Sequence, residues 1–289
     1  MTDLHIHTRY SDGTDTCSEL LGKLILNGIT TFSITDHDFA GGNFAMIEEL
    51  NRAEAKLNFV TGIEVSSIFD GTEMHLLGYG FDLDNDGIKK LIENGSRLRR
   101  EKLFAMFNHL ESKHGIFLPE ADKDELKNRV VVGKPNVVAL MIKNGIQGTV
   151  GELIERYLDD LDTESFKSDA RRVIEAVLKA GGAVSLAHPI EIMKEYGWDF
   201  AKIGSLAKRL KDVGLTALEV FHSSHGQKEL AEYKTIADKY GLLISGGSDY
   251  HGELKTVKLG RLNACGKEIA EEDLTILSAV KVVYKGAEE

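Results

Sequence analysis

The chain has 289 residues, of which 42% are hydrophobic and 28% charged, and its formal net charge is -11. This length and hydrophobic content suffice for one large core, or for one core and a small satellite. The acidic balance argues against binding to long duplex nucleic acid, which normally requires a basic face. No apolar run approaches the roughly 20 residues of a membrane span, so we expect no membrane segment, no signal peptide and a cytoplasmic location. The two cysteines, Cys17 and Cys265, predict neither a disulfide framework nor a thiolate metal site.

The first third of the chain predicts alternating strands and helices. Thr16 and Glu19 have the spacing of a capping box and predict a helix that ends before Gly28. Apolar runs predict strands over 29–35, 59–65 and 74–80, a helix over 43–56 and a turn at Asp70-Gly71. Repeated strand, helix and strand units of this kind are typical of a parallel sheet or barrel.

The alternation of strands and helices stops between residues 86 and 167, where no strand is predicted. Helical spacing from Ile88 to Leu110, and over 135–143 and 149–158, predicts a helical insertion. The alternation then resumes. Ser168 is expected to cap a helix that ends at Gly181-Gly182; strands then follow over 183–187, 217–221 and 242–245, and helices over 199–213 and 227–240. We therefore expect an α/β barrel from residues 1–85 and 168–289, with residues 86–167 forming a small helical insertion domain.

Most histidines lie where apolar runs end, and several have carboxylates beside them. His5-x-His7 places two imidazoles on one side of an extended segment. The carboxyl ends of parallel strands meet at one face of a barrel, so we expect the polar residues at these strand ends to form one site. The members are His5, His7, Asp36, His37, Glu64, His75, His188, His222, Asp249 and His251. Imidazole and carboxylate without thiolate fit Zn²⁺, Mn²⁺ or Fe²⁺, and so many ligands imply more than one ion. His109 and His114, on the insertion, are expected to be solvated.

Six motifs, in this order along the chain, resemble those of the PHP (polymerase and histidinol phosphatase) superfamily. They are His5-x-His7 with Asp12, Thr35-Asp36-His37, Gly62-Ile63-Glu64-Val65, the strand of His75, Ala187-His188-Pro189 and Ser248-Asp249-Tyr250-His251. The resemblance covers the chain apart from the insertion. It implies a distorted (β/α)₇ barrel with a trinuclear metal centre.

The same resemblance implies which residues hold each ion. The first would be bound by His5, His7, Glu64 and Asp249. The second would share Glu64 and add His75 and His188, and the third would take Asp12, His37 and His251. Asp36 would orient an imidazole from outside, as carboxylates commonly do for metal-bound histidines.

The insertion and the segment from Glu219 to His225 further resemble a branch of PHP phosphoesterases acting on nucleotides. Its members include phosphatases of nucleoside 3′,5′-bisphosphates and of nucleoside monophosphates, and nucleases that trim short RNA from its 5′ end. The implied mechanism is in-line attack on phosphorus by a hydroxide that bridges two metals. His225, or His222 in its place, would bind the phosphate or protonate the leaving oxygen.

Cations on the insertion are the candidates for further substrate contacts. Members of the branch carry a Gly-Arg-Pro-like turn, and this chain has Gly133-Lys134-Pro135, so Lys134 would reach a second phosphate. Arg97, Arg99 and Arg100 form a basic run on the long predicted helix, with Arg100 as a candidate contact. The expected cofactors are two to three divalent ions (Mn, Zn or Fe), and the expected partner is a nucleotide or short oligonucleotide.

Two alternatives stay open at this point. The chain could be a phosphatase of histidinol phosphate or another small molecule, since the insertion favours nucleotides only by analogy of fold. It could also be a non-catalytic metal-binding PHP module that serves a partner.

Overall fold

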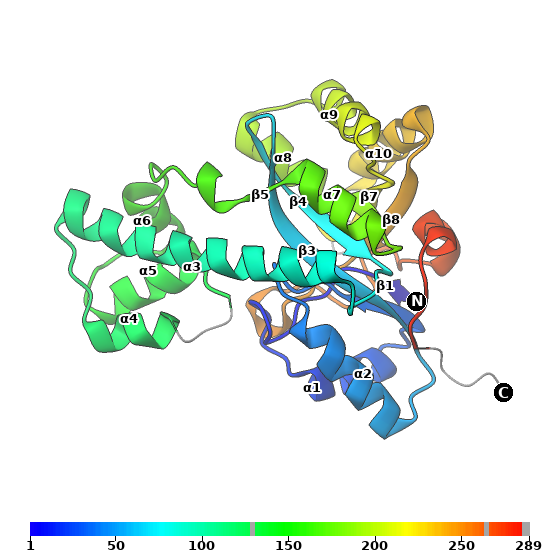
Figure 1. Cartoon of the computed structure of the whole chain (residues 1–289), viewed down its shortest axis with the longest axis horizontal. Helices are drawn as coiled ribbons and strands as arrows, with labels where there is room; N and C mark the ends of the chain where they lie inside the picture. The colour runs from blue at the N-terminus through cyan, green and yellow to red at the C-terminus, as the bar shows by residue number, and fades with distance from the viewer. Residues whose placement is uncertain (128–130, 263–265, 285–289) are drawn as a thin grey trace.

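A computed structural model describes residues 1–127, 131–262 and 266–284. Its strands form one eight-stranded sheet in the order β1-β2-β3-β4-β6-β7-β8, with β5 beside β3. The bounds are β1 Thr2–Asp3, β2 Thr31–Ile34, β3 Asn58–Phe69, β4 Thr72–Tyr79, β5 Ser168–Asp169, β6 Ala183–Leu186, β7 Ala217–His222 and β8 Leu243–Gly247. The sheet curls into a nearly closed barrel with helices outside it (Figure 1). The predicted fold class, a distorted (β/α)₇ barrel with a helical insertion, is confirmed.

The barrel closes where the start of the chain meets the end of β8 and the residues that follow it. The backbone N–H of Leu4 donates to the carbonyl of Gly246 (3.2 Å), and that of Asp249 donates to the carbonyl of His5 (2.8 Å). Gly247 is required here, because a Cβ at this position would lie 2.2 Å from the backbone nitrogen of His5. The closure therefore brings the first and last predicted metal-binding motifs side by side.

The strand β4 departs from the expected parallel arrangement. It runs antiparallel to both β3 and β6. Asp70 (φ 49°) and Gly71 (φ 77°) form the predicted turn, and two residues with positive φ suit a tight hairpin. As a result, Glu64 and His75 lie within strands and not at strand ends, which corrects the prediction for both residues. Pairing of His75 with Ser66 still keeps His75 at the same rim of the barrel.

The helices that cover the barrel mostly follow the predictions. Helix α1 (Cys17–Leu26) has the capping box of Thr16 and Glu19, and α9 (Phe200–Asp212) and α10 (Gln227–Tyr240) lie within one residue of the expected bounds. Helix α2 (Gly41–Ala53) begins two residues earlier and ends three residues earlier than predicted.

Two details near β5 and β6 were wrong or missed. Helix α7 (Ala170–Lys179) is capped by Asp169, whose side chain accepts from the N–H of Arg171; Ser168 lies one residue before the cap position and pairs with Ser67 of β3. Helix α8 (Pro189–Tyr196) was not predicted, since it is short and follows a strand almost directly. The short 3₁₀ segments are 164–166, 252–254, 271–273 and 275–279.

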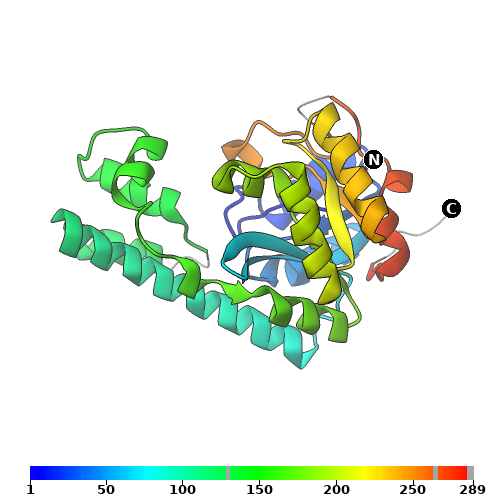
Figure 2. The same cartoon turned by 90° about the horizontal axis from the view of Figure 1, so that it is seen from above.

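The insertion extends to one side of the barrel as a group of helices (Figures 1 and 2). It contains α3 (Asp86–His114), α4 (Glu120–Lys127), α5 (Lys134–Lys143) and α6 (Val150–Tyr157). The prediction missed α4, which is short and mostly charged. The start of α3 packs on the barrel through Ile88 and Leu91.

A separate hydrophobic cluster joins the rest of α3 to α4, α5 and α6. Its members include Leu103, Phe107, Leu126, Met141 and Leu153. Division of the chain into two domains at residues 86 and 168 stays a prediction. None of the helices in the described ranges combines the length and the apolar character that a membrane span requires. Cys17 is buried, and Cys265 lies outside the described residues.

Candidate metal centre

The structure brings all nine predicted metal ligands together at one rim of the barrel. They come from six segments: the two loops that follow β1 and β2, strands β3 and β4, and the segments that follow β6 and β8. The members are His5, His7, Asp12, His37, Glu64, His75, His188, Asp249 and His251. They form overlapping groups, in which neighbouring ligand atoms lie at or slightly beyond hydrogen-bonding distance.

The first group is made by His5, His7, Glu64 and Asp249, with one ligand atom of each within 4.8 Å of the others. Oε2 of Glu64 lies 3.2 Å from Nε2 of His5 and 3.0 Å from Nε2 of His7. Oδ1 of Asp249 lies 3.3 Å from the same nitrogen of His7. These are the four residues expected at the first ion.

The second group forms around the other oxygen of Glu64. Oε1 lies 2.8 Å from Nδ1 of His75 and 2.9 Å from Nε2 of His188. Nδ1 of His37 also approaches Glu64, 3.3 Å from Oε2. The buried Glu64 carboxylate thus faces two sets of imidazoles at once, as a carboxylate shared between two ions would.

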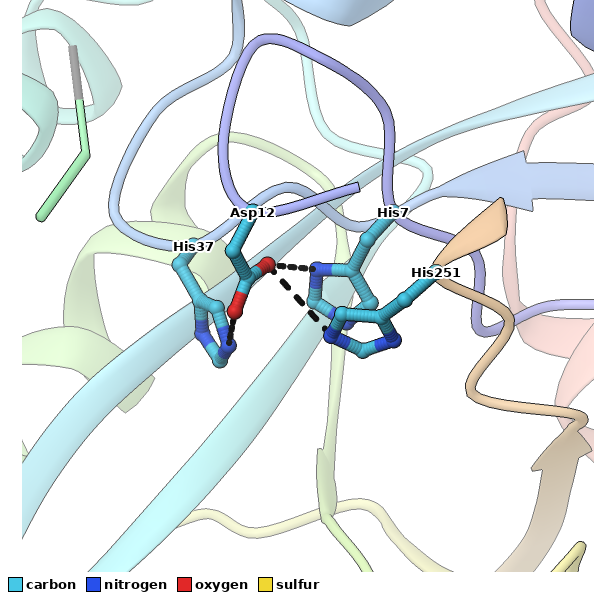
Figure 3. A group of neighbouring side chains, drawn as sticks. All are labelled: His7, Asp12, His37 and His251. Atoms are coloured by element: carbon cyan, nitrogen blue, oxygen red, sulfur yellow. Dashed lines mark ion pairs between the residues drawn. The ribbon is translucent and has the colours of Figure 1, made fainter. Parts of the chain in front are cut away.

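The third group is shown in Figure 3 and consists of His7, Asp12, His37 and His251. Oδ1 of Asp12 lies 3.3 Å from Nε2 of His251 and 3.5 Å from Nδ1 of His7, and Oδ2 lies 3.6 Å from Nε2 of His37. The rings of His7 and His251 stack with centroids 4.1 Å apart. The structure therefore adds His7 to the three residues expected here, so that its two ring nitrogens face different groups.

Two residues of the centre hold a left-handed backbone. His188 has φ 23° and Asp249 has φ 58°, a conformation that costs residues other than glycine on the order of 1–3 kcal/mol. Backbone hydrogen bonds offset this cost, because the N–H of His188 donates to Oε2 of Glu219 (2.6 Å) and that of Asp249 donates to the carbonyl of His5. With this backbone conformation, the side chains of both residues contact the other residues of the rim.

The charges at the rim suit divalent cations. Burial opposes ionisation of Glu64, but the imidazoles around it, led by His37, hold its pKa well below the usual range. Asp249 behaves in the same way, chiefly through His5. Burial opposes protonation of His7, yet Asp249 and Glu64 raise its pKa to about 9.

Several ring nitrogens in the centre are buried without a hydrogen-bond partner, among them Nε2 of His7, Nδ1 of His37 and Nδ1 of His188. A metal ion binds deprotonated groups, so ionised buried carboxylates and imidazole nitrogens without a hydrogen-bond partner are suitable ligands. The residues present therefore fit a centre for divalent ions.

Glu219 is a buried carboxylate whose role was missed in the sequence. Its Oε1 accepts from Nδ1 of His5 (2.8 Å), and its Oε2 accepts from the backbone of His188 (2.6 Å). A carboxylate on the far nitrogen of a metal-binding histidine fixes the tautomer and orientation of the ring. The available signal was a single glutamate inside an apolar strand, because a buried charge requires a partner.

Asp36 does not contact an imidazole directly, although the sequence predicted that it would orient one. It accepts from the N–H of Thr8 (2.8 Å), from Oγ1 of Thr8 (2.7 Å) and from Oγ of Ser11 (2.6 Å). Ser11 in turn lies 3.4 Å from Nδ1 of His7. Asp36 therefore holds the loop that carries Asp12, and it reaches an imidazole only through Ser11.

His222 and His225 differ in their distance from the centre. His225 is fully buried behind His222; its Nδ1 donates to the carbonyl of Val220 (2.8 Å), and burial lowers its pKa to about 3. Nε2 of His222 lies 3.4 Å from Oδ2 of Asp249, and Nδ1 accepts from the N–H of Ser224 (3.1 Å). This geometry favours His222 over His225 as the residue that faces the site.

Among the arginines of α3, Arg99 is the one that approaches the centre. Its Nε donates to Oδ2 of Asp38 (2.6 Å) and its Nη2 to Oγ of Ser66 (3.1 Å), which lies 3.5 Å from Nε2 of His75. Gly95, one turn earlier, makes this approach possible, since a Cβ there would lie 2.8 Å from Cβ of Asp38. Arg100, the candidate from the sequence, is exposed on α3.

Arg99 belongs to a basic cluster that we define as Arg99, Lys102 and Lys134. Burial, followed by the positive charges of Arg99 and Lys134, lowers the pKa of Lys102 to about 8. Lys134, at the start of α5, donates to Oδ1 of Asp159 (2.8 Å). The insertion thus places Arg99 at the metal-binding rim, with Lys102 close enough to feel the charges of Arg99 and Lys134.

A barrel with overlapping groups of imidazoles and ionised carboxylates at its rim is the architecture of a metal-dependent hydrolase. Residues 3–189 match the PHP domain family, and the chain belongs to that family. It is accordingly a metal-dependent phosphoric ester hydrolase.

Three relatives cover most of the chain. The chain is 26% identical to the 5'-3' exoribonuclease Rnm of Salmonella typhimurium (90% of this chain and 88% of the relative), and 28% identical to the phosphoribosyl 1,2-cyclic phosphate 1,2-diphosphodiesterase of Eggerthella lenta (88% and 95%). It is 24% identical to the 3',5'-nucleoside bisphosphate phosphatase of Chromobacterium violaceum (86% and 86%). A solved amidohydrolase from the last organism has the same fold, with a TM-score of 0.77 at 22% identity over 96% of this chain and 94% of that chain.

Proposed function

We propose that this enzyme hydrolyses phosphomonoesters of nucleotides, either nucleoside 3′,5′-bisphosphates, 5′-monophosphates or short 5′-phosphorylated RNA. The observation that carries the proposal is the basic cluster, which reaches the metal-binding rim through Arg99. One phosphate would react at the rim while Arg99, Lys102 and Lys134 hold a second. The names of the relatives support a phosphorylated nucleotide or RNA as the substrate class.

Two to three divalent ions, of Mn, Zn or Fe, would be held by the three groups described above, with Glu64 and His7 shared. Such ions supply Lewis-acid chemistry, because they lower the pKa of water to near neutrality and neutralise charge on phosphoryl oxygens. We propose that Glu219 keeps His5 in the tautomer with its proton on Nδ1, so that Nε2 stays free for an ion.

Stabilisation of the leaving oxygen is assigned to His222. Its Nδ1 accepts a hydrogen bond from Ser224, so the neutral ring carries its proton on Nε2, the nitrogen beside Asp249. That N–H can donate a hydrogen bond to a leaving oxygen at the rim, which takes its proton from water, because loss of the proton from the neutral ring would leave an imidazolate. His225, which is buried behind it, then supports the ring of His222, with centroids 5.2 Å apart.

An aromatic pair lies on the two loops that carry Asp12 and His37. The rings of Tyr10 and Phe39 stack with centroids 6.2 Å apart at 23°, and Tyr10 is exposed. Exposed aromatic faces provide stacking surfaces for bases, whatever their sequence. This pair supports a substrate that carries a base.

The test is phosphate release with Mn²⁺ from adenosine 5′-monophosphate, adenosine 3′,5′-bisphosphate, a short 5′-phosphorylated RNA, histidinol phosphate and ribose 1,2-cyclic phosphate 5-phosphate, with the cyclic-ester product followed separately. We expect a nucleotide or the RNA to exceed the others by at least about tenfold in kcat/KM, which corresponds to about 1.4 kcal/mol. Preference for histidinol phosphate or the cyclic ester would contradict the nucleotide assignment. Absence of any turnover would favour a non-catalytic module, with Glu64→Gln as the inactive reference.

A further inference from the structure

A second group of potential metal ligands lies far from the barrel, at the tip of the insertion. His109 and His114 occupy the last two turns of α3, and Asp160 follows α6. One ligand atom from each residue lies within 4.8 Å of the others. Figure 1 shows this end of α3 remote from the barrel, so the group is independent of the centre described above.

The contacts at this tip leave one imidazole without a partner. Nε2 of His109 lies 2.8 Å from Oδ1 of Asp160. The His114 ring lies 5.3 Å from that of His109 and packs edge-on against Tyr157 at 5.1 Å, and its Nε2 is buried without a hydrogen bond. A buried polar atom without a partner is costly and indicates an ion or water that completes the site.

The charges around the group determine what it can bind. Burial, aided by Lys113, lowers the pKa of both histidines, so both rings are neutral and present a lone pair. Lys113 pairs with Oδ2 of Asp160, which leaves Oδ1 facing the imidazoles. The carboxyl end of α3 adds the negative end of a helix dipole, whereas Lys113 and Arg156 oppose a bound cation.

We propose that His109, His114 and Asp160 bind one transition-metal ion of the Zn²⁺ type. Two imidazoles and one carboxylate are ligands that Zn²⁺ accepts, and water completes a tetrahedral set. The ion links the end of α3 to the segment after α6. Its role is structural, because the barrel centre lies elsewhere.

The first test counts Zn²⁺ per chain after equilibrium dialysis, in the wild type and in Asp160→Asn. Asp160 is half exposed, so the variant keeps the fold. We expect one ion fewer in Asp160→Asn, with unchanged turnover in Mn²⁺. Glu155→Gln, an exposed change on α6, serves as the matched control and keeps the wild-type count. Equal counts in wild type and Asp160→Asn would overturn the proposal.

The second test separates a metal site from a simple ion pair of Lys113 with Asp160. In Lys113→Gln the opposing ammonium is absent, so Zn²⁺ should bind at least severalfold more tightly at the tip and raise the melting temperature further than in the wild type. His114→Asn should abolish that Zn²⁺-dependent shift. An unchanged affinity in Lys113→Gln would show that the carboxylate serves only the lysine.

Discussion

The barrel rim and the helical insertion hold their charged groups in opposite ways. At the rim, Glu64 and Glu219 are buried at 1% and 0% exposure, and each contacts at least two other residues of the centre. On the insertion, charges such as Lys134 and Asp159 form single, partly exposed pairs, and pairs of this kind contribute only about 0–1 kcal/mol to stability. From this difference we expect rim residues to determine metal binding and turnover, and insertion residues to adjust substrate affinity.

The largest effect is expected at the centre of the rim. Glu64→Gln removes a charge that both groups of imidazoles face, so bound metal should fall and kcat/KM should drop by roughly a thousandfold, equivalent to several kcal/mol of lost charge stabilisation. Metal analysis and turnover on the same sample provide the measurement. Glu175→Gln, an exposed glutamate paired with Lys179, is the control. Full activity in Glu64→Gln would contradict the assignment of metal binding and turnover to the rim.

A smaller effect is expected at Glu219, which contacts a predicted metal ligand and is not itself one of them. Glu219→Gln keeps the size of the side chain but weakens the orientation of His5, and loss of such a partner typically costs about 10–100-fold in metal affinity or activity. Titration with Mn²⁺ should show a weaker apparent metal affinity, with kcat partly restored at high Mn²⁺. Equal metal affinity in variant and wild type would remove Glu219 from the centre.

On the insertion, Lys134→Ala should act on KM. The variant loses one charged contact to a second phosphate, so KM for a nucleoside 3′,5′-bisphosphate should rise by about tenfold while kcat stays unchanged. The matched control is Asp159→Asn, which frees the ammonium of Lys134 and should not raise KM. If KM for the bisphosphate and for the 5′-monophosphate rise equally, Lys134 does not contact the second phosphate.

The smallest effect is a pH dependence of substrate binding. With a pKa of about 8, Lys102 is cationic at pH 7 and loses its charge as the pH rises above 8, in the field of Arg99, Lys134, Asp38 and Glu195. KM for a bisphosphate should therefore rise by about threefold or more between pH 7 and 9, and Lys102→Met should flatten that rise.

A loss of folded protein would not explain this rise of KM with pH. A lysine whose pKa is lower in the folded chain makes folding more favourable as the pH rises between about 8 and its ordinary value of 10.5. A melting temperature that fell across pH 7 to 9 in the wild type but not in Lys102→Met would contradict this assignment.

Much of the fold could be predicted because its causes are local. The capping box of Thr16 and Glu19 and the turn at Asp70-Gly71 depend on residues within a few positions, and both form as expected. The family motifs also named the nine residues that the rim brings together. Their binding of ions, like the number of ions, stays a prediction.

Other features were decided by partners distant in sequence. The antiparallel course of β4 depends on its pairing with both β3 and β6, and no local pattern in β4 specifies that direction. The burial of His225 depends on Tyr233, whose ring lies 4.8 Å away on α10. The choice of Arg99 over Arg100 depends on which face of α3 packs on Asp38 through Gly95.

The sequence by itself determined the kinds of side chain available, the helices with strong caps and the order of the motifs, because these follow from neighbours and from side-chain chemistry. Only the tertiary structure decided how the motifs meet. His5 and Glu219 are 214 residues apart, and closure of the barrel places their side chains at 2.8 Å. The arrangement of the rim beside the insertion is therefore a property of the closed barrel and of helix α3, which extends from it (Figure 1).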